Sequence, residues 1–399
     1  MQELLFLAHR VPYPPDKGDK IRSWNFLKHL AERYRVHLGC FIDDPRDWEF
    51  TEFLRGICHD CCFVKLEPHR ARLRSLRGLL DGRPLTLPYY FDTALDRWVR
   101  EVLSRSAVTK VFIFCSAMAQ YVSHDTQGSP RRVADLVDID SEKWFDYART
   151  LRGPKAWLWR REGERLRDVE KDIACSFDTT VVATAAELKL LRSFVPAAAS
   201  HIAHVGNGVD AGYFSPDRQY AIPQGMRGTA LVFTGAMDYR PNIDAVLYFA
   251  RAILPSVRQR IPDINFYVVG SNPKPEIVAL SSDEGIIVTG RVPDVRPYLA
   301  HANVFVAPLR IARGVQNKVL EAMAMAKPVV ASSAAINGIE AQPGNEILVA
   351  DGAEAFTKAI CRVVETDIGA QIGRDARRRV LADYAWSASL TRLDAALGA

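Results

Sequence analysis

The sequence predicts an α/β protein that folds as two doubly wound parallel sheets, and three observations support this prediction. Short, almost continuously apolar segments alternate with longer helical patterns along the chain, which is typical of parallel strands covered by helices on both faces. These segments form two series, separated by a region rich in Gly and Pro. The length of 399 residues is enough for two or three domains.

Each predicted strand is a short apolar run bounded by Gly, Pro or polar residues. The first series comprises residues 4–9, 36–42, 62–66, 111–115, 133–137, 179–183 and 202–205. The second series comprises residues 230–234, 265–269, 286–289, 304–308, 328–331 and 347–349. Two such series in tandem predict two separate α/β domains.

The region between the two series predicts a hinge near residues 205–228. It contains Gly206-Asn207-Gly208 and then a second loop from Pro223 to Gly228. Gly and Asn accept positive φ and Pro fixes its own φ, so this region is a chain reversal rather than the interior of a helix or strand. We therefore place the first domain at residues 1–205.

The composition excludes several classes of protein. Lys and Arg (52) exceed Asp and Glu (47) by only five, which does not indicate a nucleic-acid binder. The longest apolar runs are about six to eight residues, short of the roughly 20 that span a bilayer. The N-terminus carries Glu3 where a signal peptide would be positively charged. We therefore expect a cytoplasmic protein with no membrane-spanning helix.

Seven cysteines are present, and most lie singly in apolar stretches, as reduced core thiols do. Cys58 and Cys61 have the C-x-x-C spacing of a zinc site. No second pair with ligand spacing follows them, so we predict no metal site.

The loop after the first strand, His9 to Lys20, precedes an amphipathic helix. It lacks the G-x-G-x-x-G spacing of a dinucleotide site, which argues against a dehydrogenase. Gly18 lies just before the helix, where free backbone N–H groups and the helix dipole favour an anion. The alternative is an ordinary loop in which Asp19 caps the helix.

The strongest local signal follows the strand at 304–308. A loop with Gly314 leads into a helix at 319–326, and Lys318 and Glu321 share one face at its start. Lys318 and the helix N-terminus suit a phosphate, while Glu321 can accept hydrogen bonds from a sugar diol. The alternative is a surface pair between the two side chains, worth about 0.3 kcal/mol.

Two more loops follow strands of the second series. One brings Gly235 and Arg240 to a strand end, and the other brings Gly290, Arg291 and Val292. A Gly beside an Arg suits a phosphate or the edge of a flat base. Either loop can equally be a solvated turn.

Together these segments resemble glycosyltransferase family 4, a family of nucleotide-sugar-dependent transferases with the GT-B fold. The matches are Asn207-Gly208-Val209-Asp210, Gly290-Arg291-Val292 and, above all, "GVQNKVLEAMAMAKPVVAS" from Gly314 to Ser332. The resemblance covers nearly the whole chain. The segments "PYPPDKGDKIRSWNFLKHLA" and "DLVDIDSEKWFDYA" resemble the subgroup associated with exopolysaccharide assembly beside exosortase and PEP-CTERM sorting.

The resemblance implies roles for individual residues. Glu321 matches the second Glu of the family's E-x7-E motif, which binds the donor ribose, and Lys318 matches the Lys that contacts the diphosphate. Gly18 matches the Gly near the donor phosphates, and Val292 lies where the backbone meets the base. The implied donor-binding set is Gly18, Arg240, Arg291, Val292, Arg313, Gly314, Val315, Asn317, Lys318 and Glu321.

Two positions depart from the family pattern. The first Glu of E-x7-E, which contacts the transferred sugar, is Arg313 here, and the usual Arg after the first donor-domain strand is Ala236. Arg240 is the candidate to replace the missing charge. Arg313 leaves the donor sugar open, and an acidic sugar would suit it.

The resemblance further implies a retaining reaction without a catalytic metal or cofactor. Lys318 would stabilise the leaving diphosphate. Asp138 and Asp140 follow a strand of the acceptor domain, and one of them would orient or deprotonate the acceptor hydroxyl. If that strand continues, the two side chains point to opposite sides; alternatively, Asp140 and Ser141 cap the next helix.

The implied organisation is an acceptor domain at 1–205, completed by a crossing helix within 380–399, and a nucleotide-sugar domain at 206–379. The expected partners are a nucleoside diphosphate sugar and a glycan or polyprenyl-linked acceptor, with no nucleic acid. Two alternatives stay open: a GT-B-shaped binding or scaffold protein without transferase activity, and a non-hydrolysing nucleotide-sugar epimerase.

Two segments of the first domain predict a peripheral contact with an anionic membrane. Residues 65–105 and 149–171 are rich in Lys and Arg interleaved with Leu, Trp and Tyr, and such residues favour the interface of a bilayer. The alternative is a solvated helix face with Trp157 and Trp159 packed inward.

Overall fold

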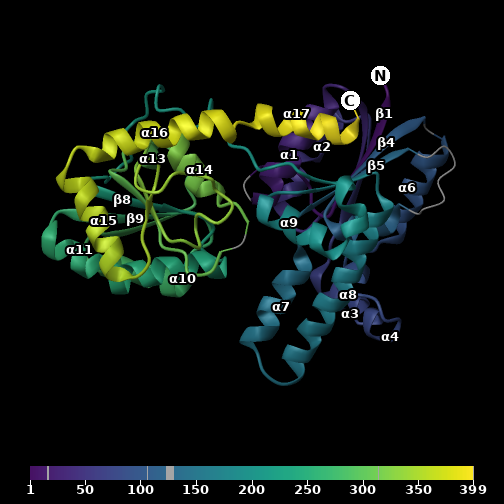
Figure 1. Ribbon diagram of the computed structural model, residues 1–399, viewed down its shortest axis with the longest axis horizontal. Helices are drawn as coiled ribbons and strands as arrows, with labels where there is room; N and C mark the ends of the chain where they lie inside the picture. Colours follow the sequence, from purple (N-terminus) through teal and green to yellow (C-terminus); the bar gives the residue numbers. More distant parts are fainter. Residues whose placement is uncertain (16–17, 106, 123–129, 313, 399) are drawn as a thin grey trace. The chain divides into compact units, whose positions relative to one another are not determined.

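The computed structural model describes residues 1–15, 18–105, 107–122, 130–312 and 314–398. It divides into two compact units: unit 1 is Met1–Gly206 with Ser389–Ala399, and unit 2 is Asn207–Ala388. Each unit is built around one parallel sheet (Figure 1).

All seven strands predicted for the first series are present in unit 1. They pair in parallel in the order β3-β2-β1-β4-β5-β6-β7. Most residues of β1, β2, β4 and β6 are buried, as continuous apolar runs require, whereas β3 at one edge is mostly half-buried. The strands are β1 (Glu3–Ala8), β2 (Arg35–Ile42), β3 (Asp60–Lys65), β4 (Val108–Phe114), β5 (Arg131–Val137), β6 (Thr179–Val182) and β7 (Ile202–His204).

The helices of unit 1 cover this sheet, and two of them, α7 and α8, form an antiparallel pair that extends away from it (Figure 1). The helices are α1 (Gly18–Ala31), α2 (Thr51–Ile57), α3 (Pro68–Ser75), α4 (Arg77–Leu80), α5 (Thr86–Tyr89), α6 (Thr93–Arg105), α7 (Asp140–Thr150), α8 (Pro154–Ser176) and α9 (Ala185–Phe194). Short 3₁₀ segments occur at Pro45–Phe50, Ser116–Tyr121 and Pro196–His201.

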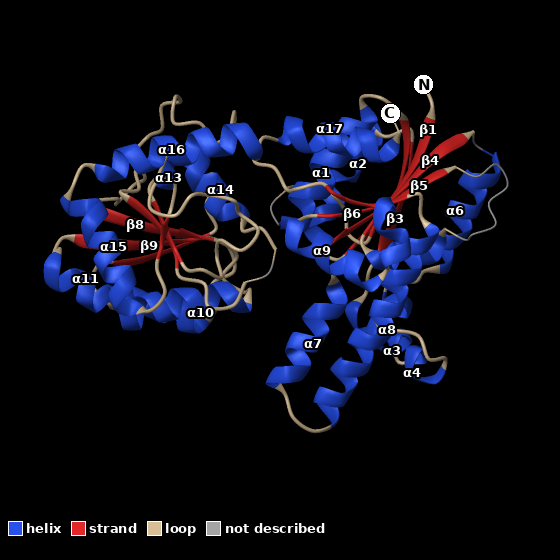
Figure 2. Cartoon of the chain, viewed as in Figure 1, coloured by secondary structure: helices blue, strands red, loops and turns tan. Residues whose placement is uncertain are grey.

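Unit 2 contains all six strands predicted for the second series. They are parallel and ordered β10-β9-β8-β11-β12-β13. In Figure 2 these strands lie between a layer with α13, α14 and α16 and a layer with α10 and α11. The strands are β8 (Thr229–Thr234), β9 (Ile264–Val269), β10 (Ile286–Gly290), β11 (Val304–Ala307), β12 (Val329–Ala331) and β13 (Leu348–Val349). The helices are α10 (Arg240–Tyr248), α11 (Leu254–Arg260), α12 (Pro275–Val278), α13 (Arg296–Ala300), α14 (Asn317–Ala324), α15 (Ala353–Glu365) and α16 (Ile368–Asp383).

The last helix, α17 (Trp386–Leu397), begins in unit 2 and continues in unit 1. The expected organisation assigns all of residues 380–399 to the first domain, whereas residues up to Ala388 belong to unit 2. Residues up to 388 stay with unit 2 because the amide of Val209 donates to the carbonyl of Tyr384 (2.8 Å) and Trp386 packs on Gly208, where a Cβ would approach the indole to 2.6 Å. In unit 1, Asp394 accepts a hydrogen bond from Arg33 (2.5 Å).

Each sheet contains one topological switch point. The strand order reverses between β1 and β4 in unit 1 and between β8 and β11 in unit 2. At such a point the connections after the two strands leave in opposite directions, so a crevice opens at the carboxyl ends of the strands, and ligands of open α/β sheets bind there. The candidate site residues are therefore expected at these two edges.

The helices were also compared with the span of a bilayer. Within the described ranges, no helix is both long enough and apolar enough to cross a membrane.

Candidate active site

The floor of the candidate site in unit 2 is made of backbone from three neighbouring strand ends. The amide of Gly235 donates to the carbonyl of Val269 (3.0 Å), and the amide of Gly270 donates to the carbonyl of Gly290 (3.2 Å). A Cβ on Gly270 would lie 1.7 Å from the carbonyl oxygen of Gly235. Only Gly permits this approach, so the floor is free of side chains.

Lys318 lies above this floor, on the first turn of α14. Its Nζ donates a hydrogen bond to Oδ1 of Asn242 and lies 4.5 Å from the ring centroid of Phe233. A Cβ on Gly235 would come within 3.0 Å of the same Nζ. Because α10 follows β8 and α14 follows β11, Asn242 and Lys318 meet at the switch point of unit 2.

Both charged groups at the start of α14 are poorly solvated. Burial lowers the pKa of Lys318 to about 7, partly offset by the charge of Glu321. Burial likewise raises the pKa of Glu321 to about 7, partly offset by Lys318. The two side chains form no ion pair with each other within the described residues, so the surface-pair interpretation is wrong. An anion placed at Nζ would restore the charge that burial disfavours.

Two buried oxygen atoms next to these groups have no hydrogen-bond partner among the described residues. They are Oδ1 of Asn317, which opens α14, and Oγ1 of Thr234, which ends β8. Most buried polar atoms in native proteins are paired. The start of α14 and the end of β8 therefore offer unused hydrogen-bonding capacity to a polar ligand.

The other residues expected to bind the donor do not take part in the contacts around Lys318 described above. Arg240 and Arg291 are exposed and make no hydrogen bond or ion pair with any described residue. Val292 and Val315 are half-buried and pack on the core of unit 2. Gly314 has a φ of 63°, which favours glycine; Arg313 lies outside the described residues.

Ala236 occupies the position at which the resemblance implies an Arg. The carbonyl of Ala236 accepts a hydrogen bond from Nδ2 of Asn242 (2.9 Å). Asn242 thus joins the loop after β8 to Lys318, a role that the sequence analysis missed. The available signal was an amide side chain two residues after the first residue of a helix that follows a strand.

In unit 1, Gly18 is exposed at the first residue of α1. Asp19 accepts a hydrogen bond from Nη1 of Arg10 (2.6 Å), and Nε2 of His9 lies 3.6 Å from the same carboxylate. Although burial opposes it, the hydrogen bond from His9 and the charge of Arg10 hold the pKa of Asp19 well below its usual range. Asp19 therefore contacts the two residues that follow the carboxyl end of β1, His9 and Arg10.

The sequence analysis also missed His9, whose signal was its place directly after the first strand. Its ring stacks on Phe114, with centroids 5.9 Å apart, and meets Tyr90 edge-on at 5.6 Å. Its Nδ1 is buried without a partner among the described residues. Since β1 and β4 flank the switch point of unit 1, His9 lies at the edge where a ligand of this sheet would bind.

Asp138 belongs to a pair of carboxyl groups at the end of β5. It shares a hydrogen bond with Glu187 of α9. Burial, and then the charge of Asp138, raises the pKa of Glu187 to about 8. Burial, and then the charge of Asp140, raises the pKa of Asp138. Such a pair holds a proton near neutral pH.

The strand does not continue through Asp138 and Asp140, so alternation along a strand does not apply to them. β5 ends at Val137, whose φ of 64° is rare for a β-branched residue, and α7 begins at Asp140. The capping interpretation of Asp140 and Ser141 is also wrong. Ile139 holds the N-cap position without a side-chain hydrogen bond, and Oγ of Ser141 donates to Glu170 (2.5 Å).

The thiols of Cys58 and Cys61 are neighbours and are buried. In the part of the chain that the structure describes, no group of three or more His, Cys, Asp or Glu side chains has the arrangement of a metal site.

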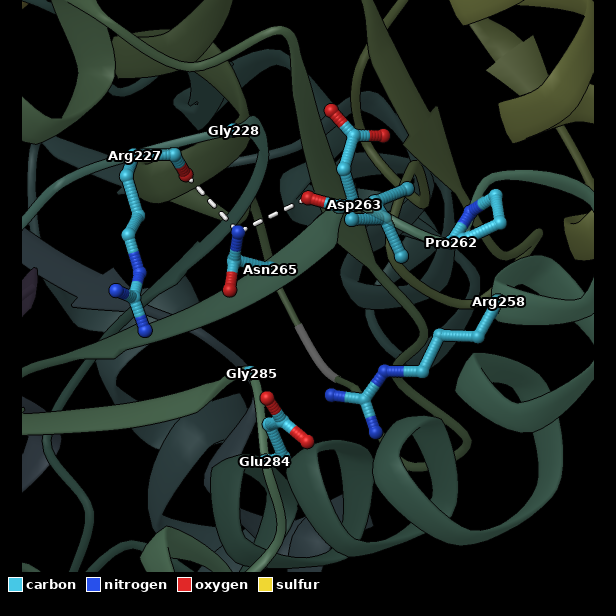
Figure 3. Close-up of a pocket in the computed structure, with 9 residues that line it drawn as sticks. Arg227, Gly228, Arg258, Pro262, Asp263, Asn265, Glu284 and Gly285 are labelled. Atoms are coloured by element: carbon cyan, nitrogen blue, oxygen red, sulfur yellow. Dashed lines mark hydrogen bonds between the residues drawn. The ribbon is translucent and has the colours of Figure 1, made fainter.

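A cavity of about 480 Å³ lies at the opposite edge of the unit 2 sheet, by the amino ends of β8, β9 and β10. Its walls carry charged residues, among them Arg227, Arg258 and Glu284 (Figure 3). Nδ2 of Asn265 donates to the carbonyls of Arg227 (2.9 Å) and Asp263 (3.0 Å), so this amide holds the loops together. Ligands of parallel sheets bind at the carboxyl ends, and we assign no ligand to this cavity.

Comparison with known proteins places this geometry in context. Residues 228–366, which lie in unit 2, match the family model described as glycosyl transferases group 1. No curated protein matches the chain.

Among solved structures, the chain resembles sucrose-phosphate synthase from Thermosynechococcus elongatus with a TM-score of 0.71 and 18% identity, covering 98% of this chain and 97% of that one. It resembles HepE from Anabaena, solved in complex with UDP-glucose, with a TM-score of 0.68 and 14% identity over the full length of both chains. It also resembles WaaG, a glycosyltransferase involved in lipopolysaccharide biosynthesis, with a TM-score of 0.66 and 15% identity, covering 99% and 100%. These proteins share the fold of two Rossmann-like domains.

Proposed function

We propose that the chain is a glycosyltransferase that transfers a sugar from a nucleoside diphosphate sugar, with retention of configuration. The match of residues 228–366 to the model of glycosyl transferases group 1 and the fold shared with known transferases support this proposal. The observation that carries this proposal is Lys318, a desolvated ammonium at the switch point of unit 2. A diphosphate is the ligand that supplies the missing countercharge. HepE was solved with UDP and with UDP-glucose, which supports a donor of this class.

Unit 2 would bind the donor through the start of α14. Lys318, held by Asn242, stabilises the negative charge that develops on the leaving diphosphate as the glycosidic bond breaks. Glu321, one turn further along the helix, accepts hydrogen bonds from the ribose diol. Neither role requires a metal ion or a cofactor, and we propose that the enzyme works without them.

Unit 1 would bind the acceptor. The carboxyl pair of Asp138 and Glu187 holds a proton near neutral pH, so Asp138 can take the proton of the acceptor hydroxyl once the pair is ionised. Asp140 adds negative charge beside this pair, which favours an acceptor hydroxyl that donates its hydrogen toward the carboxylates.

We further propose that the acceptor is a glycan or a polyprenyl-linked sugar of exopolysaccharide biosynthesis. The N-terminal resemblance to the subgroup associated with exosortase systems supports this assignment. A polyprenyl-linked acceptor would place the reaction at the cytoplasmic face of the membrane, and the protein would contact this anionic surface peripherally.

A second candidate function is binding without transfer, which the Ala at position 236 favours because the family's usual cation is absent from that strand end. A panel of nucleoside diphosphate sugars separates the two. The transferase releases a nucleoside diphosphate and forms a glycosylated product when a suitable acceptor is present. If every sugar donor in the panel binds and none is turned over with any glycan acceptor, the binding function is correct and the transferase is not.

A further inference from the structure

Exposed apolar side chains gather on one part of unit 1. Seven of the sixteen large hydrophobic residues exposed in the described chain fall within residues 73–80 and 147–157. Leu80 is 91% exposed and Trp157 is 62% exposed, which is unusual for side chains of this size. The seven residues are Leu73, Leu76, Leu79, Leu80, Tyr147, Leu151 and Trp157.

These two segments belong to one surface because α4 is fastened to α8. Nη2 of Arg161 donates to the carbonyl of Gly78 (2.7 Å), and Nη1 donates to the carbonyl of Arg83 (3.2 Å). Glu162 accepts hydrogen bonds from the amide of Leu85 (2.6 Å). Figure 1 shows α3 and α4 next to α8, at the end of unit 1 from which the α7–α8 pair extends.

The same surface is strongly basic. No acidic residue occurs from Tyr147 to Arg161, while five basic residues do. Residues 70–83 contain five Arg and a single acid, Asp81. Several of these cations are exposed and form no ion pair with any described residue: Arg72, Arg77, Arg152, Lys155 and Arg160.

The structure separates exposed residues from structural ones within the segments singled out in the sequence. Trp159 stacks on Trp144, with ring centroids 4.7 Å apart, so only Trp157 of the two is available to a partner. Tyr90 and Phe91 are half-buried in unit 1, and Phe91 stacks on Tyr121. The alternative interpretation, in which both Trp157 and Trp159 pack inward, is therefore wrong for Trp157.

We propose that α3, α4 and the facing ends of α7 and α8 form a docking surface for an anionic lipid bilayer. This inference rests on the membrane contact proposed above and assigns it to particular side chains. Trp157 and the Leu side chains of α4 insert at the headgroup level, where Trp and apolar side chains are favoured. The unpaired cations attract anionic headgroups at about 1 kcal/mol each. A protein partner would need matching acids, whereas a bilayer supplies both the apolar and the anionic component.

Vesicle flotation with the full chain tests this surface. We expect binding to vesicles of phosphatidylcholine and phosphatidylglycerol, release at high salt, and no binding to phosphatidylcholine alone. Changing Arg152, Lys155 and Arg160 to Ser should weaken binding by about two orders of magnitude, at about 1 kcal/mol per cation. Leu76→Ser with Leu80→Ser and Trp157→Ser should abolish it. We leave Arg161 unchanged because it holds α4.

The matched control changes Arg251, Lys358 and Val278 to Ser, which are exposed residues of unit 2; it should bind vesicles like the unmodified chain. Thermal unfolding of each variant checks that the fold is intact. The proposal is overturned if the chain binds neutral vesicles equally well, or if binding survives both sets of substitutions. It is also overturned if the chain is a dimer that the apolar substitutions dissociate. Nucleoside diphosphate binding, measured without vesicles, stays intact in all three variants if the donor site is correct, so failure of one proposal is distinct from failure of the other.

Discussion

Lys318 illustrates how one residue acquires a role from neighbours that are distant in sequence. Its helix and its spacing to Glu321 could be predicted from the sequence, because both depend on local pattern. Its hydrogen bond to Asn242, 76 residues away, could not. The partnership of Asp138 with Glu187 was equally hidden, since no local spacing relates a strand end to a later helix.

Replacing Lys318 by Ala should slow transfer by roughly one and a half to three orders of magnitude, or about 2 to 4 kcal/mol in the transition state. The reason is that the cation is worth most when charge develops on the leaving diphosphate. Steady-state kinetics measure this loss, with Lys358→Ala as the control for removing an exposed cation. An unchanged kcat/KM in the Lys318 variant would show that the diphosphate binds elsewhere.

The affinity for a nucleoside diphosphate should fall as the pH rises through about 7. Free Lys318 loses its proton near that pH, whereas an adjacent diphosphate favours the protonated form, so binding takes up a proton. Calorimetry across pH 6 to 9 in the Glu321→Gln background isolates Lys318 from the opposite titration of Glu321. In that background Lys318→Arg, which stays charged, should remove the pH dependence of the affinity. If the affinity of the Arg variant still falls with pH, another group causes the pH dependence.

At the scale of elements, the strands were predictable and their ends were not. All thirteen strands appear where apolar runs predict them, because a buried parallel strand has no polar face to obscure the pattern. The end of β5 depends on a positive φ at Val137, and the end of β4 on a positive φ at Cys115. Residues of these types rarely adopt that conformation, so no sequence rule anticipates it.

The carboxyl pair at the end of β5 should make unfolding pH-dependent. Glu187 titrates near its ordinary value of 4.5 when unfolded and near 8 when folded. The folded state therefore holds the extra proton between these values, and stability falls as the pH rises from about 4.5 to 8. Glu187 faces Asp138, whose own pKa is raised by burial and by Asp140 and lowered by Arg22. Replacing Glu187 by Gln should flatten this fall in denaturant titrations.

Glu170 keeps its own raised pKa in that variant, so part of the fall should remain. A second change, Glu170→Gln, should flatten it further. A pH dependence that neither substitution alters would refute the assignment of the proton to these groups.

Helix α1 is attached to β5 by a buried ion pair. Arg22 donates to Asp135 through Nε (2.7 Å) and Nη2 (3.1 Å), and both side chains are fully buried. Arg22→Met should destabilise the fold by about 3 to 5 kcal/mol because Asp135 is left as an uncompensated buried charge. The double variant with Asp135→Leu should recover part of that loss; additive losses in urea titrations would contradict the pairing.

At the scale of the whole molecule, the sheets of seven and six strands have the same order over their first six strands, and each contains one switch point. The sequence predicted the division into two halves from the Gly- and Pro-rich region alone. The resemblance implied a crossing helix, but the sequence did not indicate residue 388 as the point at which α17 changes unit, because a continuous helix carries no local signal of the neighbour on which it packs.

The proposed metal-independent reaction also belongs to this scale, because in it protein groups alone would balance the charge on the diphosphate. Treatment with EDTA should leave the transfer rate unchanged in metal-free buffer. Magnesium added afterwards should not increase it. If EDTA abolishes transfer and one divalent ion restores it, a metal ion rather than Lys318 balances the charge on the diphosphate.

Calorimetric titration of nucleoside diphosphates into the full chain tests the central claim, that unit 2 binds the donor through Lys318. The account predicts saturable binding of at least one nucleoside diphosphate, a loss of affinity in Lys318→Ala, and unchanged binding in Lys358→Ala. Binding of equal strength in the chain with Lys318 and in the chain with Ala at that position would contradict the account.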